Sequence, residues 1–531
     1  MGISTFFGLN VGMTALDTAQ QAESVISNNI ANSNTPGYVQ ENAALQEADP
    51  YPPLPSTNAP IIGGQMGQGS QVETVQRITN NFLNRQDRLN QGTSGQYDTL
   101  AQNMTQIEQI VNEPSSHSLQ NALDNFFSSW QNLSQAPNQS AVAEAVITAG
   151  QTLGQTFQTV TTQLEDMQSN LSGTVQIQLQ ELNTYAQQVA TLNQQIAGID
   201  SLQQSGQPLV ESPNQLQDQR GYILDEMSKL ANISYTQNSD GTVSVSIGSG
   251  TTGVNNIPLV QEMTAYTIAT QSSQGGVPLN MSSYISSGTS TATYTTGFSI
   301  PSGAYSGTTS SSTTININLA YVTSGQIAGN VQSLDEVNTI LAQFDGYLSS
   351  LASEVNSIQQ SANAYTVSGV PSTQTFFTLS TTTGNVILEV NSALTPDGVS
   401  VSSGTSGYND LANLMVNNAW NGNPSVPFTY SYFNLENGQM TPISSSTGST
   451  FDQMLSGYVT QLGINAAAAN SNQQTADALS QQSSNLRQSI SGVDLNQQAA
   501  QMVIYQNIYS AAAKFISIFD QMLQTAINMI P

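Results

Sequence analysis

The chain of 531 residues is long enough for more than one domain, because a single hydrophobic core rarely grows beyond about 250–300 residues. Its 34 acidic and 7 basic residues give a formal net charge of -27 at pH 7, so it lacks the clustered Lys and Arg that bind nucleic acid or an anionic membrane. Charged residues make up only 8% of the sequence, and the neutral polar residues that replace them fit a protein that packs against copies of itself.

Residues able to carry chemistry are scarce. The absence of cysteine excludes disulfides and thiolate metal sites, and the single histidine, His117, lies in a polar segment where a solvated loop is expected. Lys229 and Lys514 are the only lysines, and neither follows a glycine-rich phosphate-binding loop. We therefore predict no catalytic residue, no cofactor and no enzymatic activity.

The sequence also lacks the usual signals for secretion and membrane insertion. No basic residue precedes Arg77, so the N-terminus has no charged region of a secretory signal peptide. No apolar run approaches the ~20 residues of a membrane span. If the protein leaves the cell, we expect a route that reads no cleavable signal.

The first predicted element is a helix that begins close to Met1. An Asn-rich turn ends it at Asn32–Gly37, where Asn and Gly tolerate a positive φ angle and Asn side chains bond to the turn backbone. The chain then resumes in an extended form. The apolar positions of the helix recur every three or four residues and are Phe6, Leu9, Met13, Leu16, Ile26 and Ile30, with Ala19 and Ala22 between them.

Further helices are predicted along the chain. They cover about 80–111, 118–135, 140–168, a seam at Leu182–Ile199, Asn214–Ile233 and about 334–362. The last of these opens with a capping box at Ser333–Glu336 and buries Val337, Ile340, Phe344, Tyr347 and Leu351. Another helix starts near Thr450–Phe451 and extends to about Ile490.

Between about 234 and 330, and again between about 364 and 445, alternation of apolar and polar residues replaces the helical rhythm. Gly, Ser, Thr and Asn separate the alternating runs, which is typical of short antiparallel strands joined by turns. The clearest runs are Thr242–Gly248, Thr313–Val322, Phe376–Ser380 and Asn385–Val390.

The last helix follows Asp494, its predicted N-cap. Its apolar residues form a heptad stripe: Met502, Tyr505, Tyr509, Ala512, Ile516, Phe519, Leu523, Ala526 and Ile530. Chain ends normally fray unless something holds them, so the simplest arrangement pairs the first helix with the last. One such pair cannot bury both of its faces, and we expect neighbouring copies to cover the rest.

These elements predict an α+β multidomain fold, in which N- and C-terminal coiled-coil helices pair, a helical stem follows, and a β-rich head is inserted in the middle of the chain. We expect a terminal coiled-coil domain at 1–35 and 493–531 and a helical stem domain at 36–235 and 446–492. The β-rich outer domain would cover 236–445, with the helix near 334–362 inserted in it.

The segment Gly8–Gln40 resembles the N-terminal signature of the flagellar axial proteins, a helix ending in an "NNIANxNTxGY/F" turn. The matching residues are Asn28, Asn29, Ile30, Ala31, Asn32, Asn34, Thr35, Gly37 and Tyr38. Within that superfamily, further segments are similar to the hook-associated protein 1 (FlgK) family: Val75–Gln86, Phe126–Pro137, Leu216–Ser234, Ser324–Gly329 and Ser491–Gln498. Acidic residues usual after "SGV.L" are replaced by Asn496, Gln497 and Gln498, which alters surface electrostatics. The likeness spans almost all of the chain except the inserts around 248–312 and 421–450.

This resemblance implies a structural protein of the bacterial flagellum that is secreted by type III export and forms a homo-oligomeric ring at the hook tip. The implied location is extracellular, at the hook–filament junction. The implied partners are hook protein, a second junction protein (hook-associated protein 3) with the filament, and a cytoplasmic export chaperone.

The resemblance also assigns roles to residues. The subunit-packing seam would be Leu9, Met13, Leu16, Ile26, Ile30, Met502, Tyr505, Tyr509, Ile516, Phe519, Leu523 and Ile530. The chaperone would cover Tyr509, Ile516, Phe519 and Leu523. The inter-domain turn would be Asn32, Asn34, Thr35, Pro36, Gly37 and Tyr38.

Three other interpretations remain open at this point. A hook or rod axial protein shares both terminal motifs, but the Leu216–Ser234 segment and the long helical stem speak against it. A flagellin shares the helix–β–helix plan without this Asn-rich turn. A secreted Ser/Thr-rich adhesin would explain the β region but not the heptads at both termini.

Overall fold

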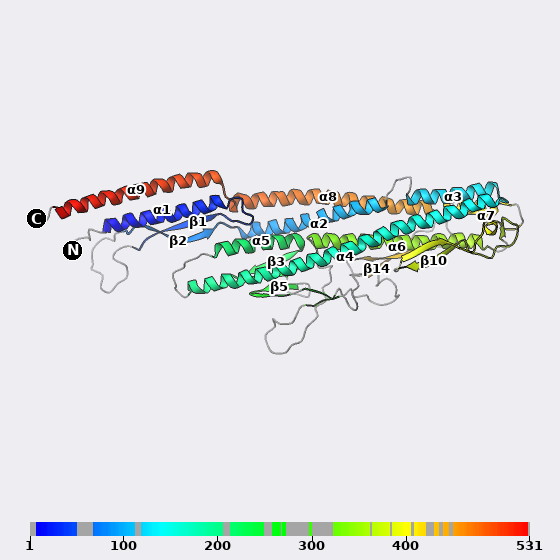
Figure 1. Cartoon of the computed structure of the whole chain (residues 1–531), viewed down its shortest axis with the longest axis horizontal. Coiled ribbons are helices and arrows are strands. Elements are labelled where there is room, and N and C mark those ends of the chain that lie inside the picture. The colour runs from blue at the N-terminus through cyan, green and yellow to red at the C-terminus, as the bar shows by residue number, and fades with distance from the viewer. Residues whose placement is uncertain are drawn as a thin grey trace, which may run out of the picture.

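The computed structural model is an elongated molecule whose long helices follow its long axis (Figure 1). Both chain ends lie at the same end of the molecule, where α1 (Phe7–Ala31) and α9 (Leu495–Asn528) run side by side. The structure describes residues 7–49, 67–111, 118–204, 213–248, 257–266, 268–271, 297–299, 322–361, 364–382, 385–404, 408–420, 429–434, 439–444 and 450–528. His117 and most of the predicted strand Thr313–Val322 lie outside these residues.

The helical stem occupies the rest of the length. Its helices are α2 (Asn81–Val111), α3 (Leu119–Gln135), α4 (Ser140–Gln204), α5 (Asn214–Leu230), α6 (Gln326–Gln359), α7 (Asp410–Trp420) and α8 (Phe451–Ser491). Thr450 and Gln453 form a capping box at the start of α8, which confirms the predicted start. Asp494 accepts a hydrogen bond from the backbone N–H of Asn496 at 2.8 Å, which confirms it as the cap of α9.

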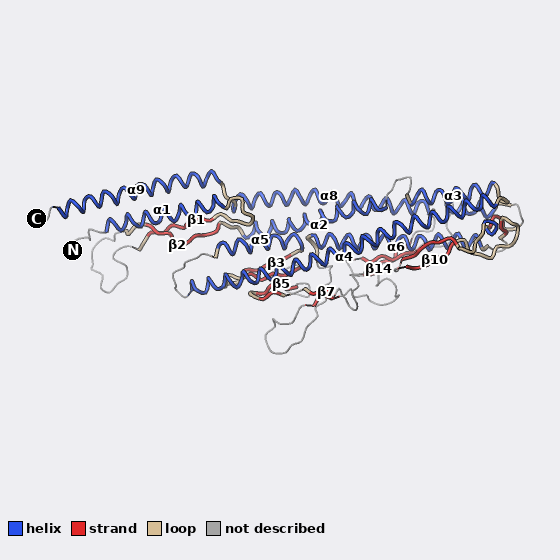
Figure 2. Tube along the Cα trace, viewed as in Figure 1, coloured by secondary structure: helices blue, strands red, loops and turns tan. Residues whose placement is uncertain are grey.

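One pair of strands lies beside α1, and most of the other strands form small antiparallel sheets along the stem (Figure 2). The described strands are β1 (Glu41–Glu47), β2 (Ser70–Arg77), β3 (Ile233–Gln237), β4 (Val243–Ile247), β5 (Ile257–Gln261), β6 (Thr264–Ala265), β7 (Ala269–Gln271), β8 (Gly297–Ser299), β9 (Tyr365–Thr366), β10 (Phe377–Thr382), β11 (Asn385–Val390), β12 (Ser400–Ser402), β13 (Thr429–Asn434) and β14 (Gln439–Ser444). A short 3₁₀ helix, η3, spans Pro396–Gly398. The order β3–β4–β5–β6 makes one four-stranded sheet, and the other described sheets are two-stranded pairs.

Helix α4 is one continuous helix of 65 residues where two segments were predicted. No proline interrupts the sequence between the two segments, and the apolar spacing continues across the expected gap at Leu171, Val175 and Leu179, all of which are buried. Burial of one continuous face stabilises the helix by more than Gly173 destabilises it, which is about 1 kcal/mol relative to alanine.

Helix α6 differs from the prediction in both its start and its place. It begins at Gln326, directly after Gly325, whose φ of 88° ends the preceding turn. Ser333 is therefore not a cap; it is buried inside the helix, and its hydroxyl donates to the carbonyl of Gly329 at 2.8 Å. The five predicted core residues of this helix are buried, but they pack within the helical stem and not in a β-rich head.

Two hydrophobic cores hold the stem together. The larger joins α2, α3, α4, α6 and α8 with β10 and β11, and aromatic rings gather in it: the rings of Phe126 and Phe376 lie 5.7 Å apart, and those of Phe157 and Tyr347 5.6 Å apart. The smaller core lies between α4, α5, the start of α6 and the sheet β3–β6. Because α6 contributes to both, it ties the two cores into one stem. The α+β class and the long terminal helices are as predicted.

Candidate assembly site at the terminal helices

Helix α1 packs against α9 at close range. A Cβ atom placed on Gly8 would lie 2.7 Å from Cε2 of Phe519, and one placed on Gly12 would lie 2.9 Å from Cγ1 of Ile516. Carbon atoms without a bond do not approach so closely, so these two glycines let the large side chains of α9 rest directly on the backbone of α1.

Gly12, Ala19, Ala22 and the larger Ile26 lie on one face of α1, at the helical spacing, and all four are buried. In the first half of the helix this face lies one residue away from the predicted seam: Gly8 and Gly12 meet α9, whereas Leu9 is half-buried and Met13 is 57% exposed. One residue turns an α-helix by about 100°. Leu16 and Ile30 are also half-buried, on the flanks of the contact.

The predicted stripe of α9 lies on the side of that helix that is partly covered. Its described members are Met502, Tyr505, Tyr509, Ala512, Ile516, Phe519 and Leu523, all half-buried except Ala512, which is buried. Most residues between them are exposed. We call these seven residues the inner stripe. Ile530 lies outside the described residues, as does Phe6 of the first helix.

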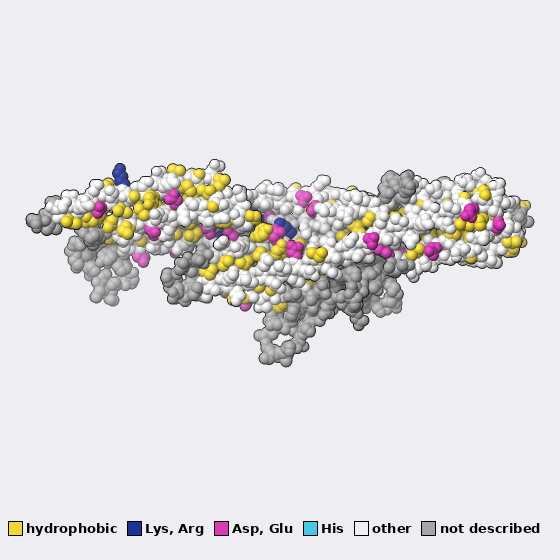
Figure 3. Space-filling view, in the orientation of Figure 1, with side chains coloured by type: hydrophobic (Ala, Val, Ile, Leu, Met, Phe, Trp, Pro, Cys, Tyr) yellow, Lys and Arg dark blue, Asp and Glu magenta, His cyan; other side chains and the backbone are white. Residues whose placement is uncertain are grey.

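A second apolar stripe on α9 was not predicted. It consists of Ile504, Ile508, Phe515, Ile518 and Met522, which are between 43% and 63% exposed. With Ala511 between them these residues keep the spacing of three and four, so they share one face next to the inner stripe. We call these five residues the outer stripe. Figure 3 shows hydrophobic side chains spread along the terminal helix pair, with few charged residues among them.

A hairpin of β1 and β2 supports the flank of α1 and was also missed. The hydroxyl of Thr14 donates to the carbonyl of Gln68 at 3.1 Å, and that of Thr18 to the carbonyl of Ser70 at 2.6 Å. Only an extended segment after the turn was predicted, because neither Glu41–Glu47 nor Ser70–Arg77 shows a strict alternation of apolar and polar residues.

The hairpin leaves an apolar groove between itself and the two terminal helices. The groove has a volume of about 210 Å³, and its walls include Ala22, Val25, Ala43, Leu45, Ile504 and Ile508. We call it the hairpin groove. It contains the first two residues of the outer stripe, so the groove and the exposed stripe form one continuous apolar surface.

The predicted inter-domain turn follows α1 directly. The backbone N–H of Thr35 donates to the carbonyl of Asn32 at 2.9 Å, and the N–H of Tyr38 donates to the carbonyl of Thr35 at 3.1 Å. Gly37 has a φ of 79°, and a Cβ there would lie 2.6 Å from Cβ of Tyr222 in α5. Asn34 and Pro36 are exposed. The turn therefore seats the terminal helices against the stem at Gly37.

Asn29 is the centre of this joint, although the prediction gave it no role beyond the motif. It is 1% exposed. Its Nδ2 donates to the carbonyl of Glu41 at 2.8 Å and to Oε1 of Gln498 at 3.1 Å. Its Oδ1 accepts from the hydroxyl of Tyr38 at 2.8 Å and from the backbone N–H of Glu41 at 2.9 Å. One side chain thus joins α1, the turn, β1 and α9.

A buried ion pair fixes the turn to the stem. Nε of Arg77 donates to Oδ1 of Asp218 in α5 at 2.6 Å, and Oδ2 of Asp218 accepts from the backbone N–H of Val39 at 3.2 Å. Burial raises the pKa of Asp218 to about 6 even though Arg77 lowers it. Burial also raises the pKa of Tyr38 above its ordinary range.

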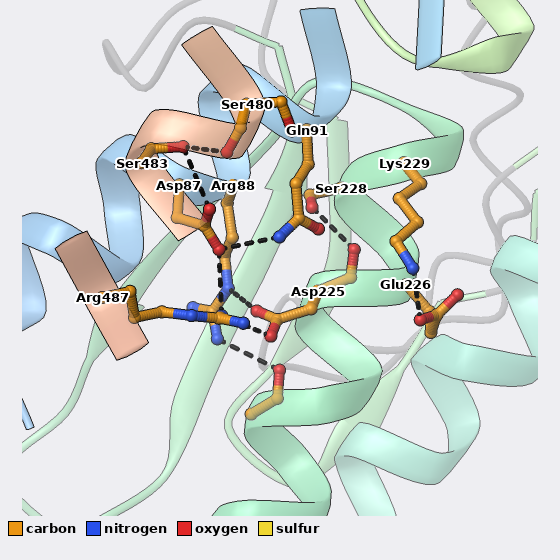
Figure 4. A network of polar contacts seen from close by, with 11 residues as sticks. Asp87, Arg88, Gln91, Asp225, Glu226, Ser228, Lys229, Ser480, Ser483 and Arg487 are labelled. Atoms are coloured by element: carbon orange, nitrogen blue, oxygen red, sulfur yellow. Dashed lines mark hydrogen bonds and ion pairs between the residues drawn. The ribbon is translucent and has the colours of Figure 1, made fainter. Parts of the chain in front are cut away.

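A second network of charges joins α2, α5 and α8 beside this joint (Figure 4). Nε of Arg88 binds Oδ1 of Asp225 at 2.7 Å, and Nη1 of Arg487 binds Oδ2 of Asp225 at 2.6 Å and Oδ2 of Asp87 at 3.1 Å. Ser483 donates to Asp87 at 3.0 Å. All the ion pairs found among the described residues lie in α2, α5, α8 or β2, in the part of the stem nearest the terminal helices.

The described residues give no sign of a site for chemistry. No group of three or more His, Cys, Asp or Glu side chains within them is arranged to hold a metal ion. In the same part of the chain, every helix is too short or too polar to span a membrane.

Comparison with known families decides the identity. A family model described as "Flagellar hook-associated protein FlgK helical domain" matches residues 104–377, more than half of the chain. The chain belongs to the FlgK family of flagellar hook-associated proteins. Models of the "Flagella basal body rod protein" and of the "Flagellar basal body rod FlgEFG protein C-terminal" match residues 9–38 and 487–529, which are the two ends that pair in the structure.

Individual FlgK-family proteins are similar over different lengths. A flagellar hook-associated protein 1 from Bacillus subtilis is 28% identical over 99% of this chain and 98% of its own length. That of Salmonella typhimurium is 31% identical over 49% of this chain and 44% of its own. A solved structure, the flagellar hook junction protein FlgK from Burkholderia pseudomallei, has a TM-score of 0.52 at 16% identity and covers 77% of this chain and 100% of its own, which shows a shared fold. FlgK proteins are structural, and this confirms that the chain is not an enzyme.

Proposed function

We propose that the protein forms the junction between the flagellar hook and the filament, where copies of the chain assemble into a ring at the hook tip. Membership of the FlgK family and the nearly full-length match to a hook-associated protein 1 support this function. The observation that carries it is the pairing of α1 with α9 at one end of a long stem, with the signature turn fixed between them by Asn29 and Gln498.

The proposed ring requires that the terminal pairs of neighbouring copies contact one another. We assign this contact to the predicted seam residues on α1 and α9 together with the exposed apolar surface beside them. The turn from Asn32 to Tyr38 would then be the joint at which the chain leaves an inner layer of helices and enters the stem. The hydrogen bonds of Asn29 to Tyr38, Glu41 and Gln498 would make it a fixed joint rather than a flexible linker.

The partners follow from the same proposal. Hook protein would contact one side of the ring, and a second junction protein (hook-associated protein 3) with the filament would contact the other. The location would be extracellular, and the protein would reach it by type III export. A cytoplasmic chaperone would cover Tyr509, Ile516, Phe519 and Leu523 before export. These four residues lie on one face of α9, so one groove could hold them all.

We also propose a division into domains. The terminal domain would comprise 1–35 and 493–531. The stem would comprise 36–235, 446–492 and, as an amendment, α6, with the small sheets of 236–445 along its side. A hook or rod protein is not favoured, because the FlgK helical domain model covers the middle of the chain. An adhesin has no supporting observation.

Removal of the gene from its source bacterium tests the function. Electron microscopy should show hooks without filaments, and the restored gene should bring the filaments back. Loss of the hooks would instead support a hook or rod protein. Intact flagella would contradict any role in the axial structure.

A further inference from the structure

The inner stripe of α9 is already partly covered by α1 of the same chain, so a neighbour can reach only the part of it that α1 leaves exposed. The outer stripe is covered less: one edge of Phe515 meets α1 at Gly12, but Phe515, Ile518 and Met522 remain 46%, 49% and 63% exposed. Five large apolar side chains, 43% to 63% exposed on one face of one helix, are unusual on the surface of a soluble monomer.

The hairpin groove next to this stripe offers a matching concave surface. Leu45 lines the groove and is 48% exposed, which leaves room for an apolar side chain from outside. The end of the outer stripe, formed by Phe515, Ile518 and Met522, lies farther along α9 than the groove. Phe515 follows Ile504 by eleven residues, which is about 16 Å along a helix. One copy of the chain therefore carries both a groove and a projecting apolar patch, displaced along the same axis.

Charge favours the same match. Lys514 stands beside Phe515 and makes no ion pair among the described residues. Glu41 lines the groove, and Glu47 follows Leu45 on the same face of β1 and is exposed. A cation next to the patch and carboxylates next to the groove would attract one another between copies, although they are apart within one copy.

We propose that Phe515, Ile518 and Met522 of one copy pack into the hairpin groove of the next copy, so that neighbouring terminal pairs are staggered along the helix axis. This inference rests on the proposed ring and names the surface that closes it. The contact joins two different surfaces, so each copy offers one to either side, as a ring or a helical assembly requires.

Cysteine pairs test this contact directly, since the chain has no cysteine of its own. The variant Leu45→Cys with Ile518→Cys, produced in the source bacterium in place of the native chain, should give disulfide-linked oligomers in isolated flagella and none in dilute monomer. Ile518 lies ten residues, about 15 Å, beyond Ile508 of the groove, too far for a disulfide within one copy. The matched control joins Leu45→Cys with Leu495→Cys, an exposed residue on another face of α9, and should give no oligomer.

A charge substitution separates failure of this inference from failure of the function. Ile518→Asp should leave the fold of the monomer unchanged, because the side chain is exposed, and should abolish filaments. Ser517→Asp, which adds the same charge at a neighbouring exposed position, should retain them.

The inference is overturned if Ile518→Asp restores filaments as the native chain does, or if both cysteine pairs cross-link equally. It is also overturned if the Leu45–Ile518 pair fails to cross-link in flagella that have filaments, or if Ile518→Asp protein is retained in the cell because it no longer binds a chaperone. Failure of the native chain itself to restore filaments would instead refute the proposed function.

Discussion

Nδ2 of Asn29 donates a hydrogen bond of 3.1 Å to Oε1 of Gln498, a residue 469 positions away in the chain. Asn29 stands in the last turns of α1 and Gln498 in the first turn of α9. The same Asn29 side chain also bonds to Tyr38 and Glu41. It therefore fixes the end of α1, the start of α9 and the turn that follows α1 relative to one another.

Asn29→Ala should loosen this joint more than its size suggests. The substitution leaves the buried polar groups of Gln498 and Tyr38 without their partner, which costs about 1–3 kcal/mol for each buried unsatisfied group. Hydrogen exchange should become faster in α1, the turn and the start of α9. Asn34→Ala, at an exposed position of the same turn, is the control and should change little. Equal exchange in both variants would show that Asn29 does not hold the joint.

Gly12→Val should separate α1 from α9. The added side chain would meet Ile516 and Phe515 at less than contact distance, and overpacking of this kind costs about 1–3 kcal/mol. Asn10→Val introduces the same β-branched residue at an exposed position of the same helix and controls for helix propensity. Limited proteolysis should release both ends of the chain faster for Gly12→Val only. If both variants are cleaved alike, the close approach of the helices does not stabilise the pair.

The stem should become more stable as the pH falls from about 7 towards 4. Burial, with a smaller contribution from the neighbouring Glu336 carboxylate, raises the pKa of Asp335 to about 7. Burial, with a smaller contribution from the Glu165 carboxylate, raises the pKa of Asp345 to about 6. A carboxyl whose folded pKa lies above its unfolded value of about 3.9 binds more protons when folded. Its stabilising contribution is therefore complete below the unfolded pKa and is lost as the pH rises through the folded pKa.

Thermal unfolding between pH 4 and 8 measures this effect. Asp335→Asn should flatten the upper part of the pH profile, because an amide does not titrate. Asp17→Asn, at an exposed carboxylate of α1, should leave the profile as it is. A native stability that rises steadily with pH over this range would contradict the assignment.

Phe519→Asp should impair both chaperone binding and assembly. The phenyl group of Phe519 lies against the α1 backbone at Gly8. A carboxylate at this position would therefore be removed from water without a partner. Chaperone affinity, measured with the purified full chain, should fall roughly tenfold or more, since each 1.4 kcal/mol is a factor of ten. Gln521→Asp adds the same charge at an exposed position and should bind normally. Wild-type affinity together with normal filaments for Phe519→Asp would show that this face of α9 is not a working surface.

Helices whose ends are marked by residues close by in the chain were predictable from the sequence. Helices α2 and α3 lie within a residue or so of their predicted bounds, because their ends are set by nearby residues such as Ser118, whose side chain caps α3. The Ser333–Glu336 box misled the prediction of α6. Its spacing fits a cap, but buried Ile327 and Val331 continue the apolar seam before it, and burial decides where the helix runs.

Surfaces formed by residues far apart in the chain were harder to predict from the sequence. The inner stripe was visible as a heptad, but the choice of large residues on α1 missed Gly8 and Gly12, since close packing uses the absence of a side chain. The outer stripe was overlooked because one helix was assigned only one apolar face. The bond from Asn29 to Gln498 leaves no periodic trace in the sequence.

Electron cryomicroscopy of isolated hook–filament junctions that contain this protein is the most direct measurement of its role. The density should show α1 and α9 of each copy as an ordered inner layer in contact with the helices of neighbouring copies. The chain should cross outward at Asn32–Gly37 into the stem. A junction in which the terminal helices lie on the outside, or in which this protein is absent between hook and filament, would contradict the proposed function.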